Sequence, residues 1–276
     1  MDHTFETPRP VELYVELDRG NVSITASDTT ESHVRVEGDQ PERLRVSQTG
    51  DGISAIVDRR SFFDFAAGLS VWITVPFDSA VVVKTGSAGV QTVGRLASAA
   101  INTGSGDVEV ADTTGVASVK TGSGEVRIGS AGRVQVKTGS GAVSVGESVG
   151  EAGVVTGSGA IEVGLAHGRA VLKSGSGDIT VDSADSDLNL NTASGSVEVA
   201  RVRRGDITVS TVSGSAGVGV PTGVPVWTDI STVTGRLESD LRGAGRPEPG
   251  QDSVKLRVKT VSGGVRLVEL EALDLR

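Results

Sequence analysis

A cluster of four small residues recurs along this chain at a nearly constant spacing. The cluster reads TGSG in most copies, and a run of the form x-Val-x-Val follows it. Successive clusters lie 18, 18, 17, 18, 18 and 18 residues apart, and they begin at Thr85, Thr103, Thr121, Thr138, Thr156, Ser174 and Thr192. Looser copies begin at Thr211, Thr232 and Thr260. A fixed period indicates a repeat architecture, so each motif has to be interpreted as part of the repeat.

Each repeat holds two short strands and two turns. Val126 and Ile128 are two residues apart, which indicates a strand with one buried face, and Val134 and Val136 indicate a second strand. The 38 glycines and the 3% aromatic content suit a core of small β-branched side chains. If the copies stack in register, they form a parallel β-solenoid. The sequence therefore predicts an all-β, single-domain parallel β-solenoid (β-helix) of about ten coils, with roughly 18 residues per coil. A sandwich or barrel is the competing arrangement, but its strands have no reason to repeat one another.

The two ends of the chain depart from the repeat. Residues 1–80 carry most of the aromatic residues, and we expect them to form irregular coils and an N-terminal cap over the open end of the core. Residues 81–276 are expected to form the regular repeats, within one continuous domain. The last twelve residues, VRLVELEALDLR, are compatible with a strand or with a short capping helix.

The repeated TGSG-x-Val-x-Val pattern resembles a bacterial β-strand-repeat domain of unknown function that is called a "putative adhesin". The resemblance covers nearly all of the chain and is clearest over residues 80–215. It implies a β-solenoid fold, and it implies a link to cell-envelope stress systems, in which some members take part. The family defines no catalytic residues that can be carried over to this chain.

Charge and composition exclude several classes of partner. The net charge of −9 argues against nucleic acid, because phosphate backbones are bound by clustered Lys and Arg. No cysteine is present, so disulfides and thiolate metal sites are excluded. The N-terminus lacks the basic and apolar regions of a signal peptide, and no run of about 18 apolar residues predicts a membrane span. We therefore expect a cytoplasmic protein, with export to the surface left open.

The glycine clusters do not match known phosphate or metal loops. A phosphate-binding P-loop needs Gly-Lys-Ser/Thr at the start of a helix, whereas each cluster here leads into a strand. A calcium-binding β-roll needs an Asp in every copy, but that position reads Asp107, Glu125, Ala142, Ala160, Asp178 and Ser196. We expect no metal, no cofactor and no catalytic residue. The glycines are interpreted instead as residues of tight corners, where positive φ or close backbone approach is needed.

Four polar features could have a functional role or a purely structural one. Thr and Ser two residues apart in each cluster form a hydroxyl grid if they share an outer face, or line the corner of the core if they point inward. The SADSD segment either gathers three carboxylates or forms a polar turn (Asp182, Asp185 and Asp187). An Arg-Gly-Asp tripeptide lies at residues 204–206, inside ordinary repeat sequence. Three histidines are too far apart in sequence to indicate a triad (His3, His33 and His167).

Four aromatic residues are the candidate contact sites. Phe62, Phe63 and Phe65 either pack onto the cap or form an exposed contact patch, and Trp227 is either a sugar platform or a capping residue. The favoured function is a non-enzymatic structural or recognition scaffold, adhesin-like, with protein partners or self-association. The alternative is a polysaccharide-binding or polysaccharide-cleaving β-helix protein, for which a glycan would be the partner.

Overall fold

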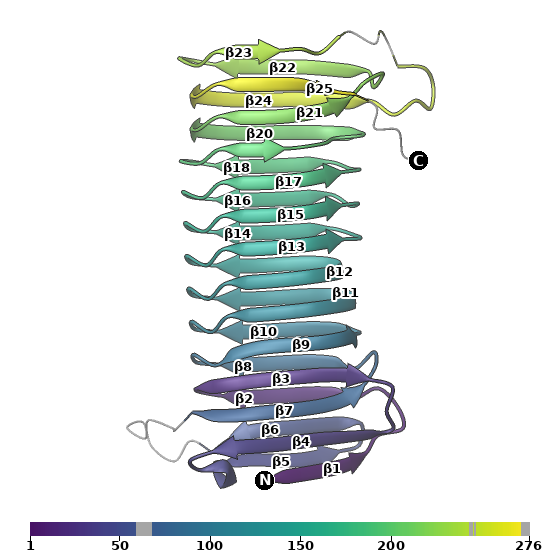
Figure 1. The fold of residues 1–276 in the computed structure, drawn as a ribbon, viewed down its shortest axis with the longest axis vertical. Coiled ribbons are helices and arrows are strands. Elements are labelled where there is room, and N and C mark those ends of the chain that lie inside the picture. The colour runs from purple at the N-terminus through teal and green to yellow at the C-terminus, as the bar shows by residue number, and fades with distance from the viewer. Residues whose placement is uncertain (59–67, 243–244, 246, 272–276) are drawn as a thin grey trace. The chain divides into compact units, whose positions relative to one another are not determined.

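The computed structural model describes residues 1–58, 68–242, 245 and 247–271. In these residues the secondary structure is β-strand throughout, apart from a short 3-10 helix, Pro41–Arg43, which confirms the predicted all-β class. The chain divides into two compact units, Met1–Gly141 and Ala142–Arg276. Figure 1 labels the strands of both units. The predicted boundary at residue 80 and the predicted single continuous domain stay predictions.

Unit 1 contains two stacks of paired strands. Stack A runs, in spatial order, through β5 (Leu44–Thr49), β6 (Gly52–Val57), β2 (Glu12–Leu17), β8 (Ala80–Thr85), β10 (Ser98–Thr103) and the ends of β11 (Val108–Thr121) and β12 (Val126–Thr138). Stack B runs through β1 (Asp2–Glu6), β4 (Glu31–Gly38), β7 (Leu69–Pro76), β3 (Gly20–Ser27), β9 (Gly89–Leu96) and the beginnings of β11 and β12. Pairing is parallel from β6 and β7 onward, and antiparallel where β1, β4 and β5 are involved.

Unit 2 also contains two stacks, and all their described pairings are parallel. Stack C runs through β14 (Ala152–Thr156), β16 (Ala170–Ser174), β18 (Leu188–Thr192), β20 (Gly205–Ser213), β24 (Val254–Ser262) and β22 (Val226–Thr232). Stack D runs through β13 (Val143–Ser148), β15 (Ile161–Ala166), β17 (Ile179–Ala184), β19 (Val197–Val199), β21 (Ala216–Pro221), β25 (Val265–Leu270) and β23 (Leu237–Ser239).

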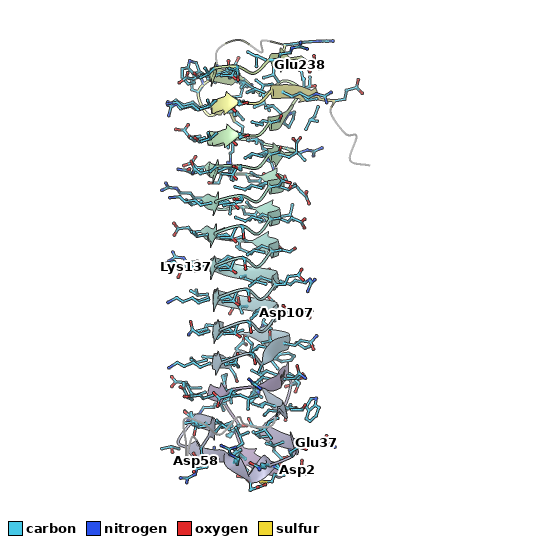
Figure 2. The ribbon with its side chains drawn as sticks, turned by 90° about the vertical axis from the view of Figure 1, so that its left-hand side faces the viewer. Asp2, Glu37, Asp58, Asp107, Lys137 and Glu238 are labelled. Carbon is cyan, nitrogen blue, oxygen red and sulfur yellow. The ribbon has the colours of Figure 1, made fainter. Side chains whose placement is uncertain are left out.

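The repeat period sets the strand register. Val108 lies opposite Val126 in unit 1, and Ile161 lies opposite Ile179 in unit 2, so each residue is paired with its equivalent 18 positions away. The aliphatic residues of these columns are at most about 4% exposed, and each buried Val or Ile stabilises the fold by roughly 1.5–3 kcal/mol. The intervening polar residues project outward, as Asp107 and Lys137 do on opposite sides of unit 1 (Figure 2).

Close backbone approach explains the glycine of each corner. A Cβ on Gly124 would overlap the carbonyl oxygen of Gly106, one coil away, and a Cβ on Gly106 would overlap the carbonyl oxygen of Ala88. Neither glycine has a positive φ. The predicted tight corner is therefore confirmed, and of its two explanations the close approach applies at these positions.

The order of the coils differs from the order of the sequence at both ends. In unit 2, Thr211 pairs with Thr260, and Thr260 pairs with Thr232. The last coil of the chain, β24–β25, therefore lies between β20–β21 and β22–β23. In unit 1, the coil β2–β3 likewise lies between β6–β7 and β8–β9. The expectation that each copy pairs with its neighbour in sequence is wrong here, because long connections allow a terminal coil to bury both of its edges. The segment Val265–Leu270 is a strand, one of its two predicted forms.

Candidate functional site

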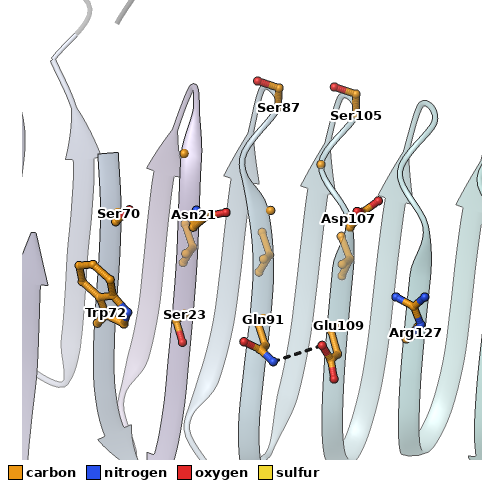
Figure 3. Close-up of a pocket in the computed structure, with 16 residues that line it drawn as sticks. Asn21, Ser23, Ser70, Trp72, Ser87, Gln91, Ser105, Asp107, Glu109 and Arg127 are labelled. Carbon is orange, nitrogen blue, oxygen red and sulfur yellow. Dashed lines mark hydrogen bonds between the residues drawn. The ribbon is translucent and has the colours of Figure 1, made fainter. Parts of the chain in front are cut away.

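A shallow groove crosses the outer face of stack B in unit 1. Its volume is about 610 Å³, and its walls come from β7, β3, β9, β11 and β12, together with the adjoining corners (Figure 3). Five neighbouring strands spaced about 4.8 Å apart make such a groove about 19 Å long. The groove therefore runs across the strands and can hold an extended ligand.

Trp72 forms the aromatic end of the groove. In β7, the alternate residues Val71 and Ile73 point into the core and are 1% exposed, so Trp72 points outward and is 43% exposed. The guanidinium carbon of Arg35, on β4, lies 5.9 Å from the centre of the indole ring. A hydrogen bond and an ion pair with Glu37 raise the pKa of Arg35 above its ordinary value, so this group stays charged beside the ring.

Small and hydrogen-bonding side chains form the floor of the groove. Ser23 lies opposite Trp72 on one side and opposite Gln91 on the other, so a hydroxyl separates the ring from the first amide. Asn21 lies opposite Ser70 and Gly89, and its Oδ1 lies over the space that a Cβ on Gly89 would need. Because these residues are short, the floor is low beside the indole ring. Figure 3 shows these side chains on the same face as Trp72.

Acidic groups dominate the end of the groove that lies away from Trp72. The Gln91 amide donates a hydrogen bond to Glu109 at 3.2 Å, and the backbone N–H of Glu125 donates to Asp107 at 2.9 Å. Arg127 is paired with Glu125, with 2.6 Å between Nη2 and Oε1. The positive charge at this end is therefore neutralised by Glu125, while the carboxylates of Asp107 and Glu109 remain exposed to a ligand.

This arrangement suits binding of a polar ligand in water. An exposed aromatic face and a row of hydroxyl, amide and carboxylate groups can contact both the apolar and the hydroxyl-bearing surfaces of one ligand. Among the described residues no group of three or more His, Asp or Glu side chains is arranged to hold a metal ion.

Sequence reasoning assigned Trp72 to the cap and so missed the groove. The sequence does contain a feature that indicates the exposed position of Trp72. The aliphatic residues Leu69, Val71, Ile73 and Val75 alternate with it, which places Trp72 on the outer face. Of the predicted contact residues, Phe62, Phe63 and Phe65 lie outside the described residues.

Trp227 lies on the outer face of β22 in unit 2 and is 53% exposed. The Lys255 ammonium is 5.8 Å from the centre of its ring. Trp227 is therefore not part of the groove around Trp72.

The corner hydroxyls do not form an outer grid. Thr103 and Thr121 are 8% exposed, and their Oγ1 atoms accept hydrogen bonds from the backbone N–H groups of Gly106 and Gly124 at 3.0 and 3.1 Å. The serine two residues after each threonine is exposed, so the two hydroxyls do not share one face. Lining the core corner is the correct explanation for the threonines.

The SADSD segment places its carboxylates on different partners. Asp185 contacts His167 at 3.1 Å and Arg203 at 3.5 Å, whereas Asp187 accepts a hydrogen bond from the backbone N–H of Asp206 at 2.9 Å. His167 also contacts Glu147, at 3.1 Å. These contacts connect adjacent coils at a corner.

The Arg-Gly-Asp tripeptide is likewise engaged within the stack. Arg204 donates to the carbonyl oxygen of Asp185 at 2.9 Å, and the carboxylate of Asp206 lies 3.9 Å from the Lys255 ammonium. Both charged residues of the tripeptide therefore have partners within unit 2.

The family model of Toastrack, DUF4097, matches residues 11–268. The chain belongs to the Toastrack DUF4097 family. No curated protein is significantly similar to this Toastrack chain.

Several solved structures are similar to this Toastrack chain. A "putative adhesin" from Parabacteroides distasonis has 12% identity and a TM-score of 0.38, with 97% of this chain and 96% of that chain covered. A "putative adhesin" from Parabacteroides merdae has 13% identity and a TM-score of 0.42, with the same shares covered. A "putative lipid binding protein" from Parabacteroides distasonis has 13% identity and a TM-score of 0.45, with 98% and 96% covered.

Over the described part of the chain, no helix has the length and apolar character needed to cross a bilayer. The cytoplasmic location expected from the sequence stays a prediction.

Proposed function

We propose that this protein is a non-enzymatic recognition scaffold whose groove in unit 1 binds a neutral or amino oligosaccharide. The observation that carries the proposal is the exposed ring of Trp72 at one end of a row of hydroxyl, amide and carboxylate side chains. An indole face packs against the apolar face of a sugar ring, while the sugar hydroxyls need both donors and acceptors. The groove offers both kinds of group within one face of stack B.

The strand spacing supports an extended ligand that lies across the strands. Equivalent positions repeat about every 4.8 Å along the groove, so a chain of similar units meets a new strand at each step. Ser23, Gln91 and Glu109 occupy one such row beyond Trp72. A short oligosaccharide therefore fits the length of the row better than a single sugar does.

The charge of the groove selects among saccharides. Asp107 and Glu109 are exposed, and Arg127 is already paired with Glu125. An acidic saccharide or a phosphate-bearing polymer would meet these carboxylates and be repelled. Neutral chains and chains with amino groups are the favoured ligands.

Binding without cleavage is the favoured outcome because each of the two carboxylates already accepts a structural hydrogen bond. Glu109 accepts a hydrogen bond from Gln91, and Asp107 accepts one from the backbone of Glu125. Glycoside hydrolysis needs one carboxyl group that holds a proton for the leaving group and a second that acts on the opposite side of the bond. Asp107 and Glu109 are both exposed. The hydrogen bonds that they accept from Gln91 and Glu125 support a structural role and therefore a scaffold.

We infer that each unit is a run of β-solenoid coils, and the support is the register of 18 residues inside each stack. The sequence predicts about ten such coils in the whole chain. A repetitive scaffold of this kind presents its outer faces to partners while its core only maintains the stack.

Isothermal titration with oligosaccharides tests the proposal. The probes are hexamers of N-acetylglucosamine, of glucosamine and of glucose, with a galacturonic acid hexamer as the acidic comparison. We expect binding to at least one of the first three, and Trp72→Ala should weaken it by about tenfold or more, since a lost aromatic contact commonly costs over 1 kcal/mol. Trp227→Ala is the matched control, because it removes an exposed tryptophan of unit 2.

Four results would contradict the proposal or a part of it. One is failure of all neutral and amino hexamers to bind at millimolar concentration, and another is equal loss of binding in the Trp72 and Trp227 variants. Preference for the galacturonic acid hexamer would contradict the electrostatic part. Release of reducing sugar from a bound hexamer would show that the protein is an enzyme.

A further inference from the structure

The coil formed by β22 and β23 has an open outer edge. β22 pairs with β24, and β23 pairs with β25, but no other strand in the described part of the chain pairs with either of them. A strand edge without a neighbour presents backbone N–H and C=O groups that can pair with a further strand. In a parallel stack, this edge is also the place where the core ends.

The apolar core is uncovered at this edge. The inward residues of the adjacent strands are at most 2% exposed (Val254, Leu256, Val258, Val265 and Leu267). The residues opposite them in β22 and β23 are half-buried or exposed (Val226, Thr228, Ile230, Leu237 and Ser239). The side chain of Leu237, for example, is 52% exposed, whereas Val265 opposite it is 1% exposed.

The outer end of unit 1 is built differently. There the antiparallel strands β1, β4 and β5 close the two stacks, and Val34, Val36 and Leu44 are buried. The edge strand β1 carries Asp2 and Glu6. Charged side chains on an edge strand discourage further pairing, and the aliphatic residues of this end are buried. The uncovered core at β22 and β23 therefore stands out as the place for an interaction.

The charges at β23 and at the residue just before it are complementary to themselves. Arg236 and Glu238 flank Leu237, both are exposed, and neither forms an ion pair with another described residue. If two copies of β23 pair in antiparallel fashion about Leu237, each Arg236 lies opposite Glu238 of the second copy. Opposite charges directly across an antiparallel pair are favourable, and a two-fold axis makes the contact twice.

The column of side chains next to this edge has the same pattern. Glu238 lies opposite Arg266, and Arg266 lies opposite Gly217, over which the carboxylate of Glu198 extends. The column therefore alternates in sign up to the edge, and Arg236 of a second copy would continue the alternation. An unrelated strand would have to supply this positive charge by chance.

We propose that a second copy of this chain pairs with the edge of β22 and β23, so that the protein forms a two-fold symmetric dimer through this coil. The pairing covers Leu237 and the core beneath it. Growth stops at two copies, because the symmetric contact occupies the β22–β23 edge of both copies. Two short strands form a small interface, so the dimer should be weak and dependent on concentration. The net charge of −9 on each copy opposes association at low salt.

Sedimentation equilibrium between about 10 µM and 1 mM, concentrations suited to a weak interface, measures this association. The monomer has a mass of 28.1 kDa, and we expect a concentration-dependent shift toward twice this mass. Arg236→Glu and Glu238→Arg should each weaken dimerisation by about tenfold or more, because each places like charges opposite one another twice. An equimolar mixture of these two variants should dimerise as the wild type does, since every pair is again of opposite charge.

Lys137→Glu is the matched control, because it makes the same charge change on an exposed position of unit 1. It should leave dimerisation unchanged. Circular dichroism of each variant should match the wild type, because the substituted side chains are exposed. Leu237→Asp is a second variant that should abolish the dimer.

The inference is overturned if the wild type stays monomeric at all concentrations, or if the mixed variants do not recover dimerisation. Species larger than a dimer would overturn the two-fold arrangement. These outcomes are separate from the oligosaccharide test, since residues of the groove and of the β22–β23 edge belong to different units.

Discussion

The side-chain oxygen of Thr121 accepts a hydrogen bond from the backbone N–H of Gly124, three residues later, at 3.1 Å. The same contact recurs between Thr138 and Gly141 and between Thr156 and Gly159. At this corner the chain turns from one stack to the other, and the threonine oxygen accepts the glycine N–H. The repeated shape of the corner therefore depends on one buried hydroxyl and one glycine.

Thr121→Val should destabilise unit 1 by about 1–3 kcal/mol, because it leaves the buried N–H of Gly124 without an acceptor. Thr121→Ser keeps the oxygen and should recover most of the loss. Urea unfolding followed by circular dichroism measures the difference. Ser123→Ala, at the exposed position of the same corner, is the control and should change the free energy of unfolding by less than about 0.5 kcal/mol. Equal stability of the Val and Ser variants would contradict the role of the hydroxyl.

Gly124→Ala should cost about 1–3 kcal/mol or more, because the added Cβ overlaps the carbonyl oxygen of Gly106 in the next coil. Gly264→Ala is the comparison, since the nearest atom to its Cβ lies 3.7 Å away, at an ordinary contact distance. Both substitutions add one methyl group. The difference between their losses of stability therefore measures the cost of the close approach between coils. Thermal unfolding of both variants measures it, and a stable Gly124→Ala protein would show that the coils can separate at no cost.

Asp78→Asn should lower stability at neutral pH but not in strong acid. The bidentate hydrogen bonds from Arg95, both 2.9 Å long, lower the pKa of Asp78 below its ordinary value of 3.8. The stabilisation is therefore complete above the pKa of the unfolded chain and is lost as the pH falls through the lower, folded pKa. Asn can keep the left-handed backbone of this residue, φ 61°, so the substitution tests the charge and not the turn.

Melting temperatures of the wild type and of Asp78→Asn, measured from pH 7 to pH 2, should converge at the acidic end. The effect should be small because the pair is exposed. Asp39→Asn, another exposed acidic position in unit 1, is the control. A difference that grows as the pH falls would have the wrong sign for this ion pair.

Truncation before Val254 should disrupt more than the end of the chain. It removes β24 and β25, which lie between two other coils, and with them five buried aliphatic side chains whose burial is worth on the order of 10 kcal/mol in total (Val254, Leu256, Val258, Val265 and Leu267). Hydrogen exchange should show that residues 226–239 lose their protection. Deleting Val226–Ser239 instead removes only the end coil, so exchange in β20 and β24 should remain slow. Retained protection of β22 after the truncation would contradict the inserted order.

The alternation of aliphatic residues determined much of the fold and one part of the site. Val126 and Ile128 indicated the inward face of their strand, and the same rule applied to β7 places Trp72 outward. The groove itself could not be predicted, because its floor combines Ser23, Gln91 and Trp72, which come from strands distant in sequence. Their adjacency depends on β3 lying between β7 and β9, an order that no single strand specifies.

The sequence by itself determined the all-β class, the buried columns and the corners, because an 18-residue period repeats the same local choices between polar and apolar positions. Only the tertiary structure decided the order in which the end coils stack. The corners of the late copies are nearly alike, so the repeat pattern does not decide whether Thr211 pairs with Thr232 or, as in the structure, with Thr260. The order depends on which arrangement leaves the least core uncovered, and that is a property of the whole stack.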